Sequence, residues 1–177
     1  MTRSDTLASP AAPAAPAAPA AWHASSLQRG GNLGIFLLRV ALGAVFLLHG
    51  SQKLFGAFGG GGIGGTAGFF GSLGASPAMM WAVVVGVIEF GGGIALVLGI
   101  LSRLAAIALA IDMVMAIALF NWSHGFFTET PRGGWEFDLV LLVALLGVAL
   151  VGPGAVSLSA VVRGRSTKPA ARLIAQA

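Results

Sequence analysis

The sequence predicts an all-α fold, an integral membrane four-helix bundle with a glycine-rich extracytoplasmic loop between helices 1 and 2. Of the 177 residues, 56% are hydrophobic and 9% are charged, whereas about 25% are charged in ordinary soluble domains. Four apolar runs approach the roughly 20 residues that a helix needs to cross a bilayer. Lysine and arginine collect at the two tails and at one tight turn, as the positive-inside rule describes.

The first element is a tail rather than a span. Prolines recur at every third position from Pro10 to Pro19 among alanines, a composition that favours extended, polyproline-like chain. They also interrupt any apolar core of a signal peptide, so a later span must direct insertion. We expect a disordered cytoplasmic Ala/Pro-rich tail over residues 1–32, a membrane domain over 33–158 and a basic cytoplasmic tail over 159–177.

Within the membrane domain, apolar runs predict spans over residues 33–55, 78–99, 104–122 and 135–151. The glycine-dense segment 56–76 between the first two spans is expected to cap the bundle or to re-enter the membrane. The fourth span is short, about 25 Å at 1.5 Å per residue, but acids in its first turn favour the helix dipole. On the second span, Gly91, Ala95 and Gly99 predict a face for close helix packing.

Charge predicts the orientation. Seven lysines and arginines fall on one side of the predicted bundle, against Lys53 and Arg132 on the other, so both termini are expected in the cytoplasm. We therefore expect a multi-pass protein of the bacterial cell (inner) membrane, with the lipid bilayer as its main partner. This placement of the basic residues explains the net charge of +4, so a nucleic-acid partner is not expected. Four short helices also suit a homo-oligomer, although no motif fixes one.

Glu89 is the only ionisable residue of the second span. A carboxylate in hydrocarbon is costly, normally faces protein and marks function. Counted along the helices, Arg39, Glu89 and Asp112 lie roughly 9 to 15 Å from the cytoplasmic end. A buried guanidinium keeps its charge, so we expect Arg39 to pair with Glu89, or else with Asp112. The pair either serves proton transfer or ligand binding, or only fixes the packing of the helices.

A second group of polar residues is predicted near the outer face. His49 and Lys53 share one side of the first span, Gln52 is adjacent, and His124 and Glu136 are expected nearby. A group titrating near neutrality, a cation and an acid are what binding a quinone carbonyl or relaying a proton requires. Alternatively, Lys53 extends to the interface and the histidines are ordinary polar residues.

The candidate site residues divide into two sets. Those predicted to be catalytic are His49, Lys53, Glu89, His124 and Glu136, and those predicted to bind a cofactor are Arg39, Gln52 and Asp112.

Several kinds of site are excluded. The chain has no cysteine, so it holds no thiolate nucleophile, cysteine zinc site or iron–sulfur cluster of its own. The histidines carry no ligand spacing, and no metal site is predicted. The glycines of residues 60–65 satisfy G-x-G-x-x-G but follow a membrane helix rather than a strand, so dinucleotide binding is rejected.

Over about residues 33–158 the chain resembles the DoxX family. The match begins with LRVALGAVFLLHGSQKLFGAFGG from residue 38. It continues in the family's order with TAGFFGSLG from residue 66, IEFGGGIALVLGILSRLAA from residue 88, HGFF from residue 124 and WEFDLVLLVALLGVALVGPG from residue 135.

The resemblance implies a four-helix membrane protein described as an oxidoreductase. It also implies relatives in thiosulfate:quinone oxidoreductase or membrane-bound redox-defence assemblies. The family's polar motif residues correspond here to Arg39, His49, Gln52, Lys53, Glu89, Arg103, His124 and Glu136. One departure is Phe137, where the family commonly has a tyrosine after the acid; the phenol is therefore absent as a proton donor.

Three functions follow as hypotheses. The leading one is a membrane subunit of a quinone-linked oxidoreductase or redox-defence assembly, whose buried charges contact quinone or relay protons. Quinone is the expected ligand, and the electrons come from a soluble or membrane redox partner or an unidentified cofactor. The alternatives are a non-catalytic membrane scaffold or assembly protein and, with less support, a small proton-coupled transporter.

Overall fold

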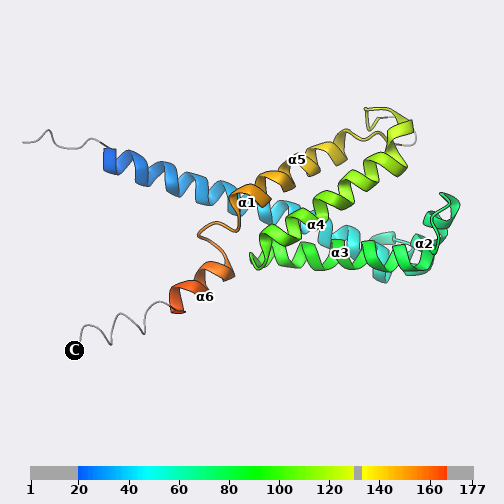
Figure 1. Ribbon diagram of the computed structural model, residues 1–177, viewed down its shortest axis with the longest axis horizontal. Helices are drawn as coiled ribbons and strands as arrows, with labels where there is room; N and C mark the ends of the chain where they lie inside the picture. Colours follow the sequence, from blue (N-terminus) through cyan, green and yellow to red (C-terminus); the bar gives the residue numbers. More distant parts are fainter. Residues whose placement is uncertain (1–19, 130–132, 167–177) are drawn as a thin grey trace, which may run out of the picture.

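The computed structural model describes residues 20–129 and 133–166, and these residues form helices and no strand. Their order is α1 (Ala20–Phe55), η1 (Ala57–Gly59), α2 (Gly62–Ser72), α3 (Ala78–Leu98), α4 (Ser102–Met115), η2 (Ala116–Asn121), η3 (Trp122–His124), α5 (Glu136–Val151) and α6 (Leu158–Ser166) (Figure 1). The predicted all-α class is confirmed. Among the described residues, three helical segments are long and apolar enough to cross a membrane, namely Gln28–Phe55, Ala78–Leu98 and Ser102–His124.

The helix bounds agree with the predicted spans except at the start of the chain. Helix α1 begins at Ala20 rather than at residue 33, so part of the predicted tail is helical. The prolines end at Pro19, and the following segment has no residue that breaks a helix as proline does. Residues 1–19 lie outside the described residues. With 16 residues, α5 is shorter than the three spanning segments, and its crossing of the membrane stays a prediction.

The predicted glycine-dense loop contains a helix, α2, which lies at the opposite end of the molecule from α6 (Figure 1). The hydroxyl of Thr66 donates to the carbonyl oxygens of Gly62 and Lys53, at 2.8 and 3.3 Å, and so fastens α2 to the end of α1. Phe70 is buried in a small core with Ala82 of α3. Tertiary contacts thus make a helix where glycine composition alone predicted a loop.

Helices α1 and α3 pack unusually closely because glycines face each other. A Cβ on Gly93 of α3 would lie 2.5 Å from the backbone nitrogen of Leu47, and one on Gly43 of α1 would lie 2.8 Å from the carbonyl oxygen of Gly93. The prediction that Gly91 contributes to this face is wrong, because a Cβ there would meet nothing within 4 Å. The close approach brings the end of α1 against the middle of α3.

The main core joins α1, α3, α4 and α5. Its most buried side chains include Phe46, Leu96, Leu109 and Leu145, each at most 1% exposed. The outer surface is also strongly apolar, for example at Leu150, which is 80% exposed. Large exposed apolar surface on long helices is what contact with lipid requires.

Helix α4 changes its winding before it ends. After Met115 the chain forms π-helical turns over Ala116–Asn121 and a short 3₁₀ turn over Trp122–His124. A π-helical turn is wider than an α-helical one and is frequent at functional sites. Here it lies on the wall of a mostly apolar cavity.

Candidate functional site

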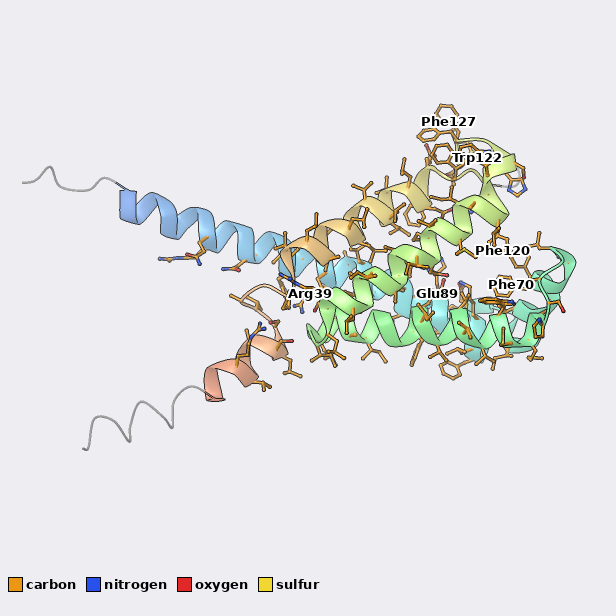
Figure 2. All side chains as sticks on the ribbon, viewed as in Figure 1. Arg39, Phe70, Glu89, Phe120, Trp122 and Phe127 are labelled. Carbon is orange, nitrogen blue, oxygen red and sulfur yellow. The ribbon has the colours of Figure 1, made fainter. Side chains whose placement is uncertain are left out.

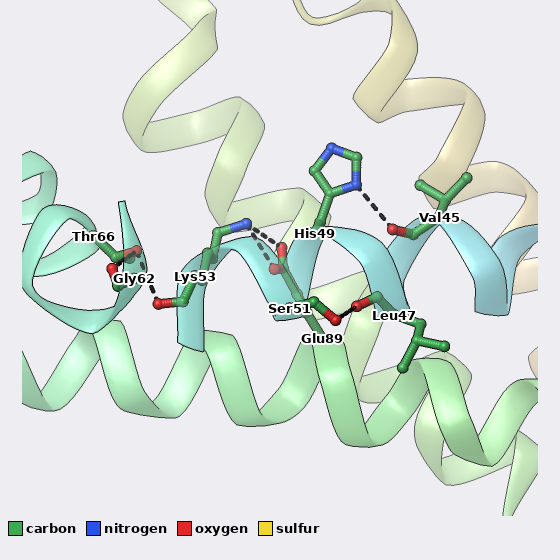
Figure 3. A network of polar contacts seen from close by, with 8 residues as sticks. All are labelled: Val45, Leu47, His49, Ser51, Lys53, Gly62, Thr66 and Glu89. Carbon is green, nitrogen blue, oxygen red and sulfur yellow. Dashed lines mark hydrogen bonds and ion pairs between the residues drawn. The ribbon is translucent and has the colours of Figure 1, made fainter. Parts of the chain in front are cut away.

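An ion pair joins the end of α1 to the middle of α3. Lys53 Nζ donates to both carboxylate oxygens of Glu89, at 2.8 and 2.6 Å (Figure 3). The side chain of Glu89 is 5% exposed and that of Lys53 is 26% exposed. A bidentate contact at this burial is a strong, charge-assisted interaction.

The prediction that Arg39 pairs with Glu89 is therefore wrong. Arg39 is 1% exposed, and its Nη2 donates to the carbonyl oxygen of Val156 at 2.7 Å. Its guanidinium lies against Gly99, which is ten residues beyond Glu89 and thus about 15 Å along the helix. Figure 2 shows Arg39 toward the α6 end of the molecule, away from Glu89 and Phe120.

The error has two physical causes. Depth was counted from residue 33, as if that residue were level with the end of α3, whereas Arg39 itself lies against Gly99, just after α3 ends. In addition, the long side chain of Lys53 extends inward to Glu89, whereas the prediction placed it in the outer group. Lys53, and not Arg39, therefore lies with Glu89 and Asp112.

Asp112 of α4 borders the same cavity as Lys53 and Glu89. Its Oδ2 is buried, and no residue in the described part of the chain hydrogen-bonds to it. Two carboxylates and one ammonium group therefore line a common space, and we call these three residues the charged cluster. With one positive charge for two acids, the charged cluster can balance its charge by holding a proton.

The cavity beside the charged cluster has a volume of about 730 Å³ and lies between α2, α3 and the α4–η2 segment. Its walls are mostly apolar, and the rings of Phe70 and Phe120 stack with their centroids 5.5 Å apart. Trp81 and Phe69 also line it. We call it the aromatic cavity. It combines flat apolar walls with one charged side, the usual composition of a small-molecule site.

The far wall of the aromatic cavity is tied to α5. Asn121, which lines the cavity, donates its Nδ2 to Asp138 Oδ2 at 2.6 Å. Asp138 belongs to the first turn of α5. This hydrogen bond holds the π-helical segment in place and extends the polar contacts from the cavity wall to α5.

The other candidates of the predicted outer group do not line the aromatic cavity. His49 is exposed, and its Nδ1 donates to the carbonyl oxygen of Val45 at 2.9 Å (Figure 3). Gln52 donates to the carbonyl oxygen of Phe58 at 3.4 Å. Of that group, Lys53 alone reaches the aromatic cavity.

His124 is the last residue of η3 and Glu136 is the first residue of α5, so the two flank the loop between these helices. Glu136 accepts the backbone N–H of Thr128 at 2.8 Å, which closes the loop before α5. His124 Nδ1 is buried and has no hydrogen-bond partner within residues 20–129 and 133–166. In the same ranges, no group of three acidic, histidine or cysteine side chains is arranged to hold a metal ion.

The aromatic walls of the cavity were not predicted from the sequence. Thr66, Phe69 and Phe70 stand three and four positions apart, the spacing of one helix face, and all three line the cavity. That spacing was a usable signal for α2. Phe120 and Asn121 carried no comparable signal, because the π-helical turn shifts the face that they occupy.

Comparison with known proteins supports the membrane class. A family model described as DoxX matches residues 34–122. A Bacillus subtilis protein named "Putative oxidoreductase CatD" is 32% identical over 126 residues, 71% of this chain and 84% of its own length. A Mycobacterium tuberculosis protein named as an uncharacterized membrane protein is 33% identical over 156 residues, 82% of this chain and 91% of its own length. No solved structure matches the chain.

Proposed function

The chain belongs to the DoxX family of membrane proteins, and from this premise we propose that it is the membrane subunit of a quinone-linked oxidoreductase. The observation that carries the proposal is the charged cluster on one side of the aromatic cavity. A quinone has the same division, with a flat apolar ring and two polar carbonyl oxygens.

The shape of the aromatic cavity supports this ligand. Its volume of about 730 Å³ is within the 300 to 1,000 Å³ range of small-molecule sites. The rings of Phe70 and Phe120 offer faces on which a quinone ring can stack. Several lining side chains, including Val84 and Leu119, are also exposed on the apolar outer surface, so an isoprenoid tail can extend into the lipid.

The charged cluster supplies the chemistry of quinone reduction. Reduction of a quinone to a quinol takes up two electrons and two protons. As the electrons arrive, the ammonium group of Lys53 stabilises the negative charge on the carbonyl oxygen. Asp112 then passes the proton held by the charged cluster to that oxygen. The second proton comes from the aqueous phase, which also returns a proton to Asp112. The electrons come from a redox partner protein or from a bound cofactor, because a chain without cysteine has no cysteine-based redox centre of its own.

Trp81 makes the binding step directly testable, since it lines the aromatic cavity. The purified full chain in mild detergent is titrated with a short-chain quinone analogue, and tryptophan fluorescence is recorded. We expect saturable quenching that is largely lost in Trp81→Phe and retained in Trp122→Phe, because Trp122 lies outside the cavity and is 64% exposed. Equal quenching in both variants would remove the aromatic cavity as the quinone site.

A second experiment separates a redox subunit from a scaffold. The bound molecules of the purified chain are extracted with organic solvent and identified by mass spectrometry, and Glu89→Gln is assayed with its redox partner. A stoichiometric quinone, together with loss of turnover in a still-folded variant, supports the proposal. A protein without such a ligand, whose Glu89→Gln variant keeps full function and its partner complex, supports a scaffold in which the ion pair only fixes packing.

The orientation is part of the proposal: four spans in the bacterial inner membrane with both termini in the cytoplasm. The absence of cysteine makes the chain suitable for labelling at single introduced thiols. A thiol from Ser166→Cys, at the end of α6, is expected to react only after the inner membrane is permeabilised. A thiol from Ser123→Cys, before the loop that leads to α5, is expected to react in intact cells whose outer layers admit the reagent. The reverse pattern would invert the proposed orientation.

A further inference from the structure

Arg39 is buried without a carboxylate partner. It is 1% exposed, and while its Nη2 donates to Val156, its Nε and Nη1 have no partner among the described residues. A guanidinium keeps its charge, and an uncompensated buried charge is strongly unfavourable. The chain contains six acidic residues. Five of them lie in the described residues, and none of these five forms a salt bridge with Arg39. The five are Glu89, Asp112, Glu129, Glu136 and Asp138. The burial of Arg39 points to an anion that is not part of the described chain.

A second cavity, of about 880 Å³, lies at the α6 end of the molecule. Residues of α1, of the α3–α4 turn and of the segment that leads from α5 into α6 line this cavity. Arg103 and Arg163 line it, and its lining residues include no acid. Arg39 does not line it, but the residue to which Arg39 donates, Val156, directly follows the lining residue Ala155. We call this space the basic cavity.

The polar groups of the basic cavity are arranged as donors. Ser102, the first residue of α4, is 2% exposed, and its Oγ is buried without a hydrogen-bond partner in the described part of the chain. It lines the basic cavity at a helix N-terminus, where unpaired N–H groups and the helix dipole favour an anion. Asn32 Oδ1 accepts the N–H of Ala155, so the Asn32 amide is fixed at the rim. Guanidinium, hydroxyl and helix N–H groups together match a tetrahedral oxyanion.

We propose that the basic cavity binds a phosphate group, carried by the headgroup of an anionic phospholipid or by the free ion. The lipid source fits the surroundings, because Leu101 and Leu104 beside the cavity are 69% and 65% exposed and can contact acyl chains. Basic pockets between membrane helices on the cytoplasmic side are typical sites for such headgroups. The phosphate provides a negative charge for Arg103 and Arg163, since no acid lines the cavity. The inference does not depend on the quinone proposal, since the two cavities share no lining residue.

The test measures ligand-dependent thermal stabilisation of the full chain in an uncharged detergent. Four titrations are compared: short-chain phosphatidylglycerol, short-chain phosphatidylcholine, sodium phosphate, and sodium chloride at matched ionic strength. The test variant is Arg103→Gln with Arg163→Gln, which leaves the buried Arg39 intact. The matched control is Arg29→Gln, an exposed arginine of α1 that does not line the basic cavity. Ser102→Ala, which removes one hydroxyl group, is a second test variant.

We expect saturable stabilisation by phosphatidylglycerol that exceeds the effects of phosphatidylcholine and sodium chloride. The double variant is expected to bind about 25-fold more weakly, at about fivefold for each arginine, which corresponds to about 1 kcal/mol per basic residue at an anionic surface. Arg29→Gln is expected to bind within about twofold of the wild type, because Arg29 does not line the cavity. Ser102→Ala is expected to weaken binding by about fivefold, the effect of one lost hydrogen bond.

The titrations also distinguish the source of the phosphate. If sodium phosphate stabilises the wild type as strongly as phosphatidylglycerol and the double variant weakens both, the ligand is the free ion and the site stands. If the double variant binds like the wild type, or if Arg29→Gln loses as much affinity, general surface charge accounts for the effect and the basic cavity is not a phosphate site. The same conclusion follows if neither phosphate ligand exceeds sodium chloride.

Discussion

Replacing Lys53 by methionine is expected to be among the most damaging single changes in the membrane domain. The variant keeps the bulk and the apolar stem of the side chain but leaves Glu89, 5% exposed, without its cation. Asp112 Oδ2, already without a partner in the described residues, then faces a second uncompensated carboxylate. Breaking one side of a buried ion pair costs about 3 to 5 kcal/mol. Because Lys53 is 26% exposed, we expect a value near the lower end, about 3 kcal/mol.

Glu89→Gln should cost less, about 1 to 2 kcal/mol, because the amide oxygen can still accept a hydrogen bond from Lys53. The double variant should be more stable than the sum of the single changes predicts, since it removes both charges together. The expected coupling energy is about 2 kcal/mol, within the range measured for residues in direct contact. His49→Gln is the matched control on the same helix, because His49 is exposed and hydrogen-bonds to Val45 rather than to either residue of the pair.

Thermal unfolding in detergent, followed by circular dichroism, measures these differences. A destabilisation of 3 kcal/mol corresponds to a fall in Tm of about 6 to 12 °C for a domain of this size. His49→Gln is expected to stay within about 0.5 kcal/mol of the wild type. Strictly additive single changes, or a Lys53→Met variant as stable as the wild type, would show that the ion pair does not stabilise the fold.

Three further predictions concern the surrounding structure. Gly93→Ala should destabilise the protein by about 1 to 3 kcal/mol, because its Cβ would overlap α1, whereas Gly91→Ala, facing open space, should be neutral or slightly stabilising; Tm values of the two variants make the comparison. Asp138→Asn should cost about 1 to 2 kcal/mol by weakening the charge-assisted hydrogen bond from Asn121, and a Tm equal to the wild type would argue against that bond. Phe70→Ala should cost about 3 to 5 kcal/mol as a large-to-small core change and should abolish quinone-dependent fluorescence quenching, which is measured in the same sample.

The long helices could be predicted from the sequence because the residues at their ends and their apolar composition indicate the same bounds. Helix α3 follows Pro77 and ends before Gly99, whose φ of +72° is the left-handed conformation that glycine adopts readily after a helix. Helix α5 similarly ends before Gly152 and Pro153. At these positions the chemistry of a single residue decides where the helix stops, so no tertiary information is needed.

Only part of the site could be predicted from the sequence, because its contacts join residues that are far apart in the chain. Glu89 and Asp112 could be singled out as acids within apolar runs, and both line the aromatic cavity. The partner of Glu89 could not be chosen, because Arg39 and Lys53 lie on the same helix and side-chain direction decides which one reaches it. The partner of Arg39 is a main-chain carbonyl 117 positions away, at Val156. Any residue supplies such a carbonyl, so no sequence pattern marks it.

The π-helical segment Ala116–Asn121 also sets the position of the aromatic wall of the cavity. A π-helical turn accommodates one residue more than the α-helical turn it replaces, and each residue of an α-helix advances by about 100° around the axis. If the same residues wound as an ordinary α-helix, every side chain after the π-helical turn would be rotated by about that angle. Phe120 would then leave its stack on Phe70, and Asn121 would turn away from Asp138. The winding of this one segment therefore decides whether the aromatic wall exists, and a change that only regularises the helix is sufficient to dismantle it.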